Sequence, residues 1–296
     1  MSRLAVFLFL TLLSSGVRAD ISVTDDAGRK LRISQPAQRI VSLAPHVTEL
    51  LFSAGAGAQV VAVAAFSNYP LAAQALPVID GGVRLDIGHI AELRPDLAVG
   101  WLGGNSRSDL DKLESLGIPV FIAEPHRLES LPTTLLALGR LAGSEKAALR
   151  TVREYRVRLA KLREEYHGRR PIRVFLEVST QPLVTLNYAH LANDVLALCG
   201  GRNIFAASED IAPAVGAESV TVEDPDAILF SETLGTASTV SEWWRRRSTP
   251  RAVRDGQLYS FTPELLLRQS PRILEGARQV CAALDQVRER EAVGRR

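Results

Sequence analysis

The chain lacks the short motifs that mark the commoner enzyme classes. Its 296 residues contain no Gly-x-Ser-x-Gly, no phosphate-binding loop, no Gly-x-Gly-x-x-Gly after a predicted strand and no His-Glu-x-x-His. An exported α/β enzyme stays open as an alternative. Such an enzyme would need a convergent acid–base set, a nucleophile or a metal cluster, and the sequence indicates none of these.

An excess of one charge is also missing. The chain has 35 Lys and Arg against 33 Asp and Glu, a net charge of +2, and no basic cluster interleaved with aromatic residues. These counts argue against a nucleic acid partner. The nearest candidate, the arginines at 245–247 after Trp243 and Trp244, is interpreted as the solvated end of a helix.

Long apolar runs are absent except at the N-terminus. The run at 4–13 is shorter than the ~20 residues that span a bilayer. A single positive charge precedes it, and Val-Arg-Ala at 17–19 supplies small residues for a signal peptidase. Residues 1–19 are therefore predicted to be a signal peptide cleaved near Ala19. No cysteine lies there to carry a lipid anchor, so the mature protein is expected to be exported and soluble.

Cysteine is scarce too, with only Cys199 and Cys281 in the chain. In an oxidising compartment an even number of cysteines favours pairing over two buried free thiols. A cross-link over this separation would stabilise the fold by roughly 4 kcal/mol in the chain-entropy model.

Apolar strands alternate with helices through both halves of the chain. A hairpin is expected at 21–33, followed by strands at 39–43, 60–65, 97–101 and 119–122, and later by strands at 172–178, 227–230 and 257–261. Pro-Asp followed by apolar residues occurs at 95–99 and again at 225–230, which indicates an internal repeat. This alternation predicts mostly parallel α/β sheets.

Residues 144–166 contain neither Gly nor Pro and are rich in helix-forming residues. The fold class predicted is therefore α/β, with two mostly parallel-sheet lobes at 20–142 and 169–296. One long rigid helix within 143–168 joins them, and a ligand cleft lies between them. A final helix is expected at 271–284, and the polar residues 285–296 are expected to fray.

Loops after strand ends are where an α/β cleft binds its ligand. Aromatic, amide and glycine residues follow several predicted strands here, namely Phe66, Asn68, Tyr69, Trp101, Gly103, Gly104, Asn105 and Tyr188. Rings can stack on the face of a large flat ligand while amides bond its polar rim. His46 and His126 also follow strands on this side, which leaves a metal site open. Isolated histidines are the favoured interpretation because nothing fixes a ligand geometry.

Several motifs resemble the class III substrate-binding proteins of ABC importers. They are Arg-Ile-Val-Ser-Leu-Ala-Pro at 39–45, Thr-Glu at 48–49 and Arg-Pro-Asp-Leu at 94–97, together with the helical linker. Further segments at 67–70, 101–105, 199–205 and 268–273 resemble the cobalamin-binding members of that class. The resemblance covers residues from about 38 to 285.

The resemblance implies a monomeric periplasmic protein that captures cobalamin and delivers it to the permease and ATPase of an importer at the inner membrane. It implies no catalytic residue, no metal site and no cofactor. Haem or a ferric siderophore, carried by other members of the class, is the alternative ligand. The ligand-binding positions that it carries over are Phe66, Tyr69, Trp101, Glu264, Leu265, Leu266, Leu267 and Arg268.

The resemblance also assigns a disulfide to Cys199 and Cys281. One carboxylate on each lobe would dock on permease arginines, at Asp86 in the first lobe and Glu218 in the second. The chain departs from the pattern at two positions where the resemblance places a tryptophan. The first position falls near Gly82, and the second is occupied by Ala212.

Overall fold

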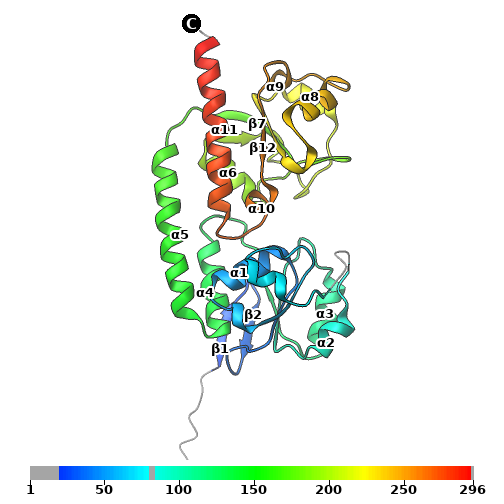
Figure 1. The fold of residues 1–296 in the computed structure, drawn as a ribbon, viewed down its shortest axis with the longest axis vertical. Helices are drawn as coiled ribbons and strands as arrows, with labels where there is room; N and C mark the ends of the chain where they lie inside the picture. Colours follow the sequence, from blue (N-terminus) through cyan, green and yellow to red (C-terminus); the bar gives the residue numbers. More distant parts are fainter. Residues whose placement is uncertain (1–19, 80–83, 295–296) are drawn as a thin grey trace, which may run out of the picture.

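The computed structural model describes residues 20–79 and 84–294. The predicted signal peptide and Gly82 lie outside the described residues. The molecule has two lobes stacked along its long axis, and α5 (Glu145–Tyr166) runs along one side of the stack (Figure 1). Each lobe is a parallel sheet with helices on both faces, so the predicted two-lobed α/β fold is confirmed.

The N-terminal lobe begins with an antiparallel hairpin of β1 (Ile21–Thr24) and β2 (Lys30–Ile33). Its main sheet is parallel throughout and has the order β4 (Val60–Val63), β3 (Ile40–Ser42), β5 (Leu97–Gly100), β6 (Val120–Ile122). Two separate cores show that α1 (Pro45–Ser53) and α4 (Leu131–Ala142) cover one face, and α2 (Ile87–Glu92) and α3 (Arg107–Ser115) the other. Short 3₁₀ turns at Gly57–Gln59 and Leu71–Ala75 flank β4.

The C-terminal lobe repeats this strand order. Its sheet reads β10 (Gly201–Asn203), β7 (Ile172–Glu177), β11 (Ala227–Ser231), β12 (Leu258–Phe261), again with every pair parallel. In both main sheets the strand that comes second along the chain lies at one edge, and the first, third and fourth strands follow it across the sheet. Helices α6 (Leu191–Leu198) and α11 (Ile273–Gly294) pack on one face, and α7 (Ala217–Glu223), α8 (Ala237–Arg245) and α9 (Arg251–Arg254) on the other. A small hairpin of β8 (Ser179–Thr180) and β9 (Leu183–Val184), a 3₁₀ turn at Glu232–Leu234 and α10 (Pro263–Leu266) complete the lobe.

The repeated Pro-Asp motif has the same structural role in each lobe. Asp96 accepts the backbone N–H of Arg39 at 2.9 Å, and Asp226 accepts that of Arg173 at 2.8 Å. In return, the N–H of each aspartate donates to the carbonyl of the same arginine. Each aspartate therefore fixes the entry of the first strand of its sheet against the third, which explains why the motif occurs once per lobe.

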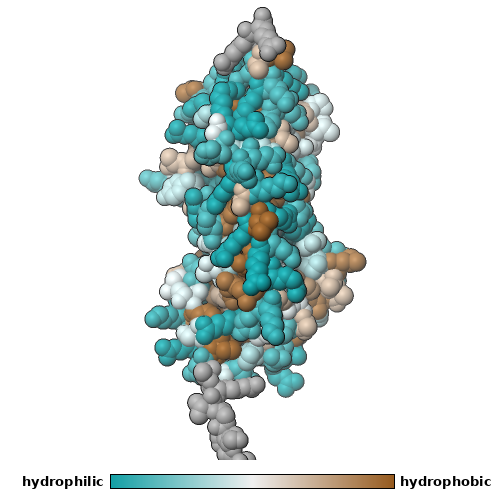
Figure 2. Space-filling model, turned by 90° about the vertical axis from the view of Figure 1, so that its left-hand side faces the viewer, coloured by the Kyte–Doolittle hydropathy of each residue, from teal (hydrophilic) through white to brown (hydrophobic). Residues whose placement is uncertain are grey.

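Helix α5 joins the lobes through a continuous core. It contacts α1 and α4 in the first lobe and α6 and α11 in the second. Its buried side chains belong to one cluster that extends through both lobes; they are Ala148, Val152, Tyr155, Leu159 and Leu162. Figure 2 shows the side of the molecule along which α5 lies, and hydrophilic residues predominate there. The helix is therefore amphipathic and is anchored at both ends.

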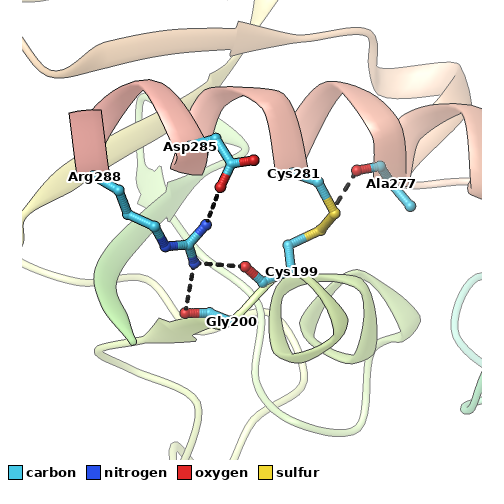
Figure 3. The surroundings of a disulfide bond; sticks show 6 residues. All are labelled: Cys199, Gly200, Ala277, Cys281, Asp285 and Arg288. Atoms are coloured by element: carbon cyan, nitrogen blue, oxygen red, sulfur yellow. Dashed lines mark hydrogen bonds and ion pairs between the residues drawn. A yellow bond between two sulfur atoms is a disulfide. The ribbon is translucent and has the colours of Figure 1, made fainter. Parts of the chain in front are cut away.

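A disulfide joins Cys199, at the end of α6, to Cys281 in α11 (Figure 3). This confirms the predicted pairing. The predicted fraying after residue 284 is wrong, because α11 continues to Gly294. Two contacts explain the extra turns: Val287 is fully buried, and Arg288 donates to the carbonyl of Cys199 at 2.7 Å.

Candidate functional site

The candidate site lies where the carboxyl ends of the two sheets face each other. Because all strands of each main sheet are parallel, the loops that leave them gather at one edge. Two cavities open at this boundary, and both are lined by Pro45 and Trp101. The indole of Trp101 therefore borders both spaces.

The first cavity, called here the inter-lobe cavity, has a volume of about 330 Å³. It is mainly apolar, and both lobes supply its wall. The N-terminal lobe contributes Pro45, His46, Trp101, Gly103 and Glu124, and the C-terminal lobe contributes Val178, Leu186, His190, Ile211, Ala212, Leu267, Arg268 and Gln269. Ala212, where the resemblance places a tryptophan, thus leaves space at the wall of this cavity.

The second cavity, the N-lobe cavity, has a volume of about 390 Å³ and is more polar. It lies beside the ends of β3, β4 and β5 and the start of α3. Phe66 and Trp101 line it on the apolar side, and Asn105, Ser106 and Asp109 on the polar side. Of the residues singled out after the predicted strands, five line one or both cavities, namely Phe66, Trp101, Gly103, Gly104 and Asn105.

Trp101 follows β5 directly, and its ring is held by small neighbours. A Cβ atom at Gly104 would lie 2.3 Å from Cζ2 of the indole, and one at Gly103 would lie 2.6 Å from Cζ3. Only glycine fits at these two positions. The side chain of Asn105 accepts the backbone N–H of Trp101 at 2.9 Å, and the His46 ring meets the indole edge-on at 4.9 Å between centroids. The Trp-Leu-Gly-Gly-Asn segment is therefore a preformed support for one aromatic ring.

Phe66 and Tyr69 lie in the loop after β4. Phe66 has a φ of 64°, a left-handed conformation that is unfavourable for a phenylalanine, and 76% of its surface is exposed. Tyr69 is 44% exposed, and the guanidinium of Arg272 lies 3.9 Å from the centre of its ring. An exposed ring on a strained backbone next to a cavity is typical of a binding loop.

The segment 264–268 divides into different environments. Leu267 and Arg268 line the inter-lobe cavity. Leu266 is fully buried in the core, so its side chain lies away from the cleft surface. Glu264 and Leu265 are half-buried on α10 and are not part of the lining of either cavity.

Arg268 lines the inter-lobe cavity, but two nitrogens of its guanidinium already donate to other groups of the protein. Nη1 donates to Glu49 at 2.9 Å and to Asn68 at 2.7 Å, and Nη2 donates to the carbonyl of Phe66 at 3.0 Å. No local sequence pattern indicates these contacts, because the partners lie 200 to 219 residues away along the chain.

Two histidines face the inter-lobe cavity, whereas only one of them was singled out from the sequence. Burial lowers the pKa of both His46 and His190 to about 4, so both rings are neutral at pH 7. His46 Nε2 is 3.1 Å from the carbonyl of Ala123, and His190 Nδ1 accepts the N–H of Ala192 at the start of α6. His126 is exposed, and its Nδ1 bonds the carbonyl of Ala189.

Within residues 20–79 and 84–294, no group of three or more His, Cys, Asp or Glu side chains could hold a metal ion. In the same residues, no helix is long and apolar enough to cross a membrane. The structure therefore gives no support to a metal site at His46 and His126.

The two acidic residues expected to dock on a permease are exposed at equivalent places. Asp86 caps α2 and accepts the N–H of His89 at 3.0 Å, and Glu218 lies in the first turn of α7. Helix α2 precedes the third strand of the first sheet, and α7 precedes the third strand of the second. The internal repeat thus places one carboxylate on each lobe.

Comparison with known proteins gives consistent matches over most of the chain. Residues 40–265 match the model of a family described as periplasmic binding protein. A curated vitamin B12-binding protein of Vibrio cholerae is 36% identical over 250 residues, which is 84% of this chain and 90% of that protein. A vitamin B12-binding protein of Yersinia pestis is also 36% identical, over 248 residues, with coverage of 84% and 86%.

Solved structures agree with these matches. The crystal structure of the periplasmic vitamin B12 binding protein of Vibrio cholerae superposes with a TM-score of 0.80 at 34% identity, over 86% of this chain and 98% of that chain. A periplasmic heme binding protein from Pseudomonas aeruginosa gives a TM-score of 0.71 at 25% identity, over 83% and 92%.

Proposed function

The chain belongs to the periplasmic binding protein family, and from this premise we propose that it captures cobalamin, or a related corrinoid, in the cleft between its lobes. The observation that carries the proposal is the arrangement of Trp101 between two cavities, with Phe66 at the edge of one of them. A corrin is a large flat ring with amides at its rim. The indole and phenyl rings offer apolar faces to it, and the loops offer hydrogen-bonding groups.

The proposed ligand site comprises Phe66, Tyr69, Trp101, Leu267 and Arg268. Phe66 can stack on the ligand but has no hydroxyl to donate a hydrogen bond to it. The orientation of the ligand therefore depends on the loop backbone and on the polar groups around the cavities. Nη1 and Nη2 of Arg268 are already bound to Glu49, Asn68 and Phe66. Arg268 therefore contributes the shape of its side chain and its positive charge to the cavity wall, rather than a hydrogen bond to a corrin amide.

Calorimetric titration of the mature protein with cyanocobalamin, haemin and a ferric siderophore tests the ligand. Cobalamin is expected to bind at a single site, and haemin and the siderophore are expected to bind weakly or not at all. Saturable binding of haemin alone would overturn the corrinoid assignment while leaving the family unaffected.

Haem is the second candidate, and one observation favours testing it. Neutral His46 and His190 both line the inter-lobe cavity, and neutral imidazole is a ligand of iron. Against it, His190 Nδ1 already accepts a backbone N–H. The absorption spectrum of the loaded protein separates a corrinoid from a haem.

The further proposal is that the loaded protein, a monomer freed of its signal peptide near Ala19, docks on the permease of an ABC importer. Its docking carboxylates are Asp86 and Glu218, which are both exposed and which the repeat places one on each lobe. Salt bridges to arginines of the permease would guide the encounter through complementary charge.

Reversing one of these charges tests the docking proposal. Glu218→Arg should reduce cobalamin uptake by cells that depend on this protein and leave affinity for cobalamin unchanged, because Glu218 lines neither cavity. Glu289→Arg, which reverses an exposed carboxylate on α11, serves as the control. Equal uptake by Glu218→Arg and by the unmodified protein would exclude this role.

A further inference from the structure

A buried carboxylate lies at the boundary between the lobes. The side chain of Glu49, on α1, is only 1% exposed. It accepts the hydroxyl of Ser270 at 2.6 Å, Nη1 of Arg268 at 2.9 Å and Nη1 of Arg272 at 3.1 Å. A buried carboxylate is stable only with such charge-assisted partners. All three donors come from residues 268–272 of the other lobe, so Glu49 ties the lobes together.

The same two arginines hold the loop that carries the candidate ligand rings. This loop, residues 66–69, is called here the aromatic loop. Arg268 donates to the carbonyl of Phe66 at 3.0 Å and to the side chain of Asn68 at 2.7 Å. Arg272 places its guanidinium 3.9 Å from the ring centre of Tyr69.

The neighbour of Glu49 holds the one remaining residue of the loop. The hydroxyl of Thr48 lies 2.9 Å from that of Ser67 and 2.8 Å from that of Ser42 at the end of β3. Every residue of the aromatic loop is thus bound either by α1 or by a guanidinium that Glu49 holds. Since the φ of Phe66 is 64°, the loop needs such contacts to keep its conformation.

We propose that Glu49 is a positioning residue of the ligand site: through Arg268 and Arg272 it holds Phe66 and Tyr69 in the conformation that binds the ligand. Its own side chain lines neither cavity. The proposal deepens the function proposed above and depends on it only for the identity of the ligand.

Charge explains why the carboxylate is required. Arg268 and Arg272 are 14% and 23% exposed at the side chain, and both approach the same oxygen of Glu49. Without the negative charge, two poorly solvated cations would repel each other and move toward water. The aromatic loop would then lose its contacts at Phe66, Asn68 and Tyr69. If the binding conformation fell to a tenth of the population, the apparent dissociation constant would rise tenfold.

Hydrogen exchange in the ligand-free protein, combined with cobalamin titration, tests the proposal. Glu49→Gln keeps the shape of the side chain and removes its charge. Glu49→Asp keeps the charge on a side chain that is one methylene shorter. Glu177→Gln is the matched control, because Glu177 is also fully buried but bonds Trp244 and Thr180 in the C-terminal lobe. Arg272→Lys is a second variant that keeps a cation near Glu49 and removes the planar group over Tyr69.

In Glu49→Gln the backbone amides of residues 64–69 should exchange at least tenfold faster, and the variant should bind cyanocobalamin at least tenfold more weakly. Glu49→Asp should recover part of both effects, and Glu177→Gln should show neither. Should Glu49→Gln fail to fold, faster exchange of the amides of residues 64–69 in Arg272→Lys is the expected result.

Unchanged exchange in this segment, or an affinity within twofold of the unmodified protein, would overturn the positioning role. If the unmodified protein binds no cobalamin, the proposed function fails, and the exchange comparison alone then decides the role of Glu49.

Discussion

At the scale of the residue, the conformation of Trp101 depends on the two glycines that follow it. Gly104→Ala would bring a methyl group to 2.3 Å from the indole, so the ring must move. Loss of one stacked aromatic contact costs ~1–3 kcal/mol, and the affinity for cobalamin should therefore fall by about one to two decades. Gly88→Ala is the control, since a Cβ there meets no atom closer than 3.4 Å. Equal affinity of both variants would show that Trp101 does not contact the ligand.

Two residues of the cleft predict a loss of stability in acid. Burial lowers the pKa of His46 and His190 from 6.5 to about 4. The unfolded chain therefore takes up these protons at higher pH than the folded chain does. Their contribution to stability is complete above pH 6.5 and is lost as the pH falls toward about 4.

Urea unfolding of the unmodified protein and of His46→Gln, from pH 7 to pH 4.5, measures this contribution. The free energy of unfolding should fall less steeply in the variant. Burial raises the pKa of Glu177 to about 7, so its contribution is lost as the pH rises and has the opposite sign over the same range. The difference between the two proteins isolates His46, and parallel pH profiles would exclude the assigned shift.

At the scale of the element, the disulfide fastens the last helix to the C-terminal lobe. It joins α6 to α11 and closes a segment with a sequence separation of 82 residues. In the chain-entropy model this closure is worth roughly 4 kcal/mol. Cys199→Ala/Cys281→Ala should lower the urea midpoint accordingly. An unchanged midpoint would show that packing of α6 against α11 suffices without the bond.

Helix α5 predicts that the lobes move little on binding. Bending it would break backbone hydrogen bonds and disturb the buried contacts of Tyr155 and Leu159. Small-angle scattering should give nearly the same radius of gyration for the ligand-free and the cobalamin-loaded protein. A large contraction on loading would refute a rigid linker.

The elements that could be predicted from the sequence differ from the others in the strength of their local sequence pattern. Helix α5 and the repeated strands carry strong local patterns, because one long face or a full apolar run is buried. The edge strand β10 was missed, because Gly-Arg-Asn has no strand pattern and only its pairing with β7 makes it extended. Helix α4 was missed because Pro132 and Gly139 interrupt the helical pattern of its residues.

At the scale of the whole molecule, the sequence indicated the cleft but could not indicate its interior. The rings of Phe66 and Trp101 were expected at the strand ends, and both line a cavity there. Glu49 bonds Arg268 and Arg272, which lie in the other lobe and far away along the chain. His190 likewise lines a cavity whose wall both lobes supply. Contacts of this kind form only when both lobes are folded and packed together, so no local sequence pattern predicts them.

The central claim is that Trp101, at the junction of the two cavities, holds a corrinoid between the lobes. Calorimetric titration of residues 20–296, unmodified and with Trp101→Ala, with cyanocobalamin tests it most directly. The unmodified protein should give a one-site isotherm, and Trp101→Ala should bind about one to two decades more weakly, since 1.4 kcal/mol is a factor of ten. No binding of cyanocobalamin by the unmodified protein, or equal affinity of the two proteins, would contradict the claim.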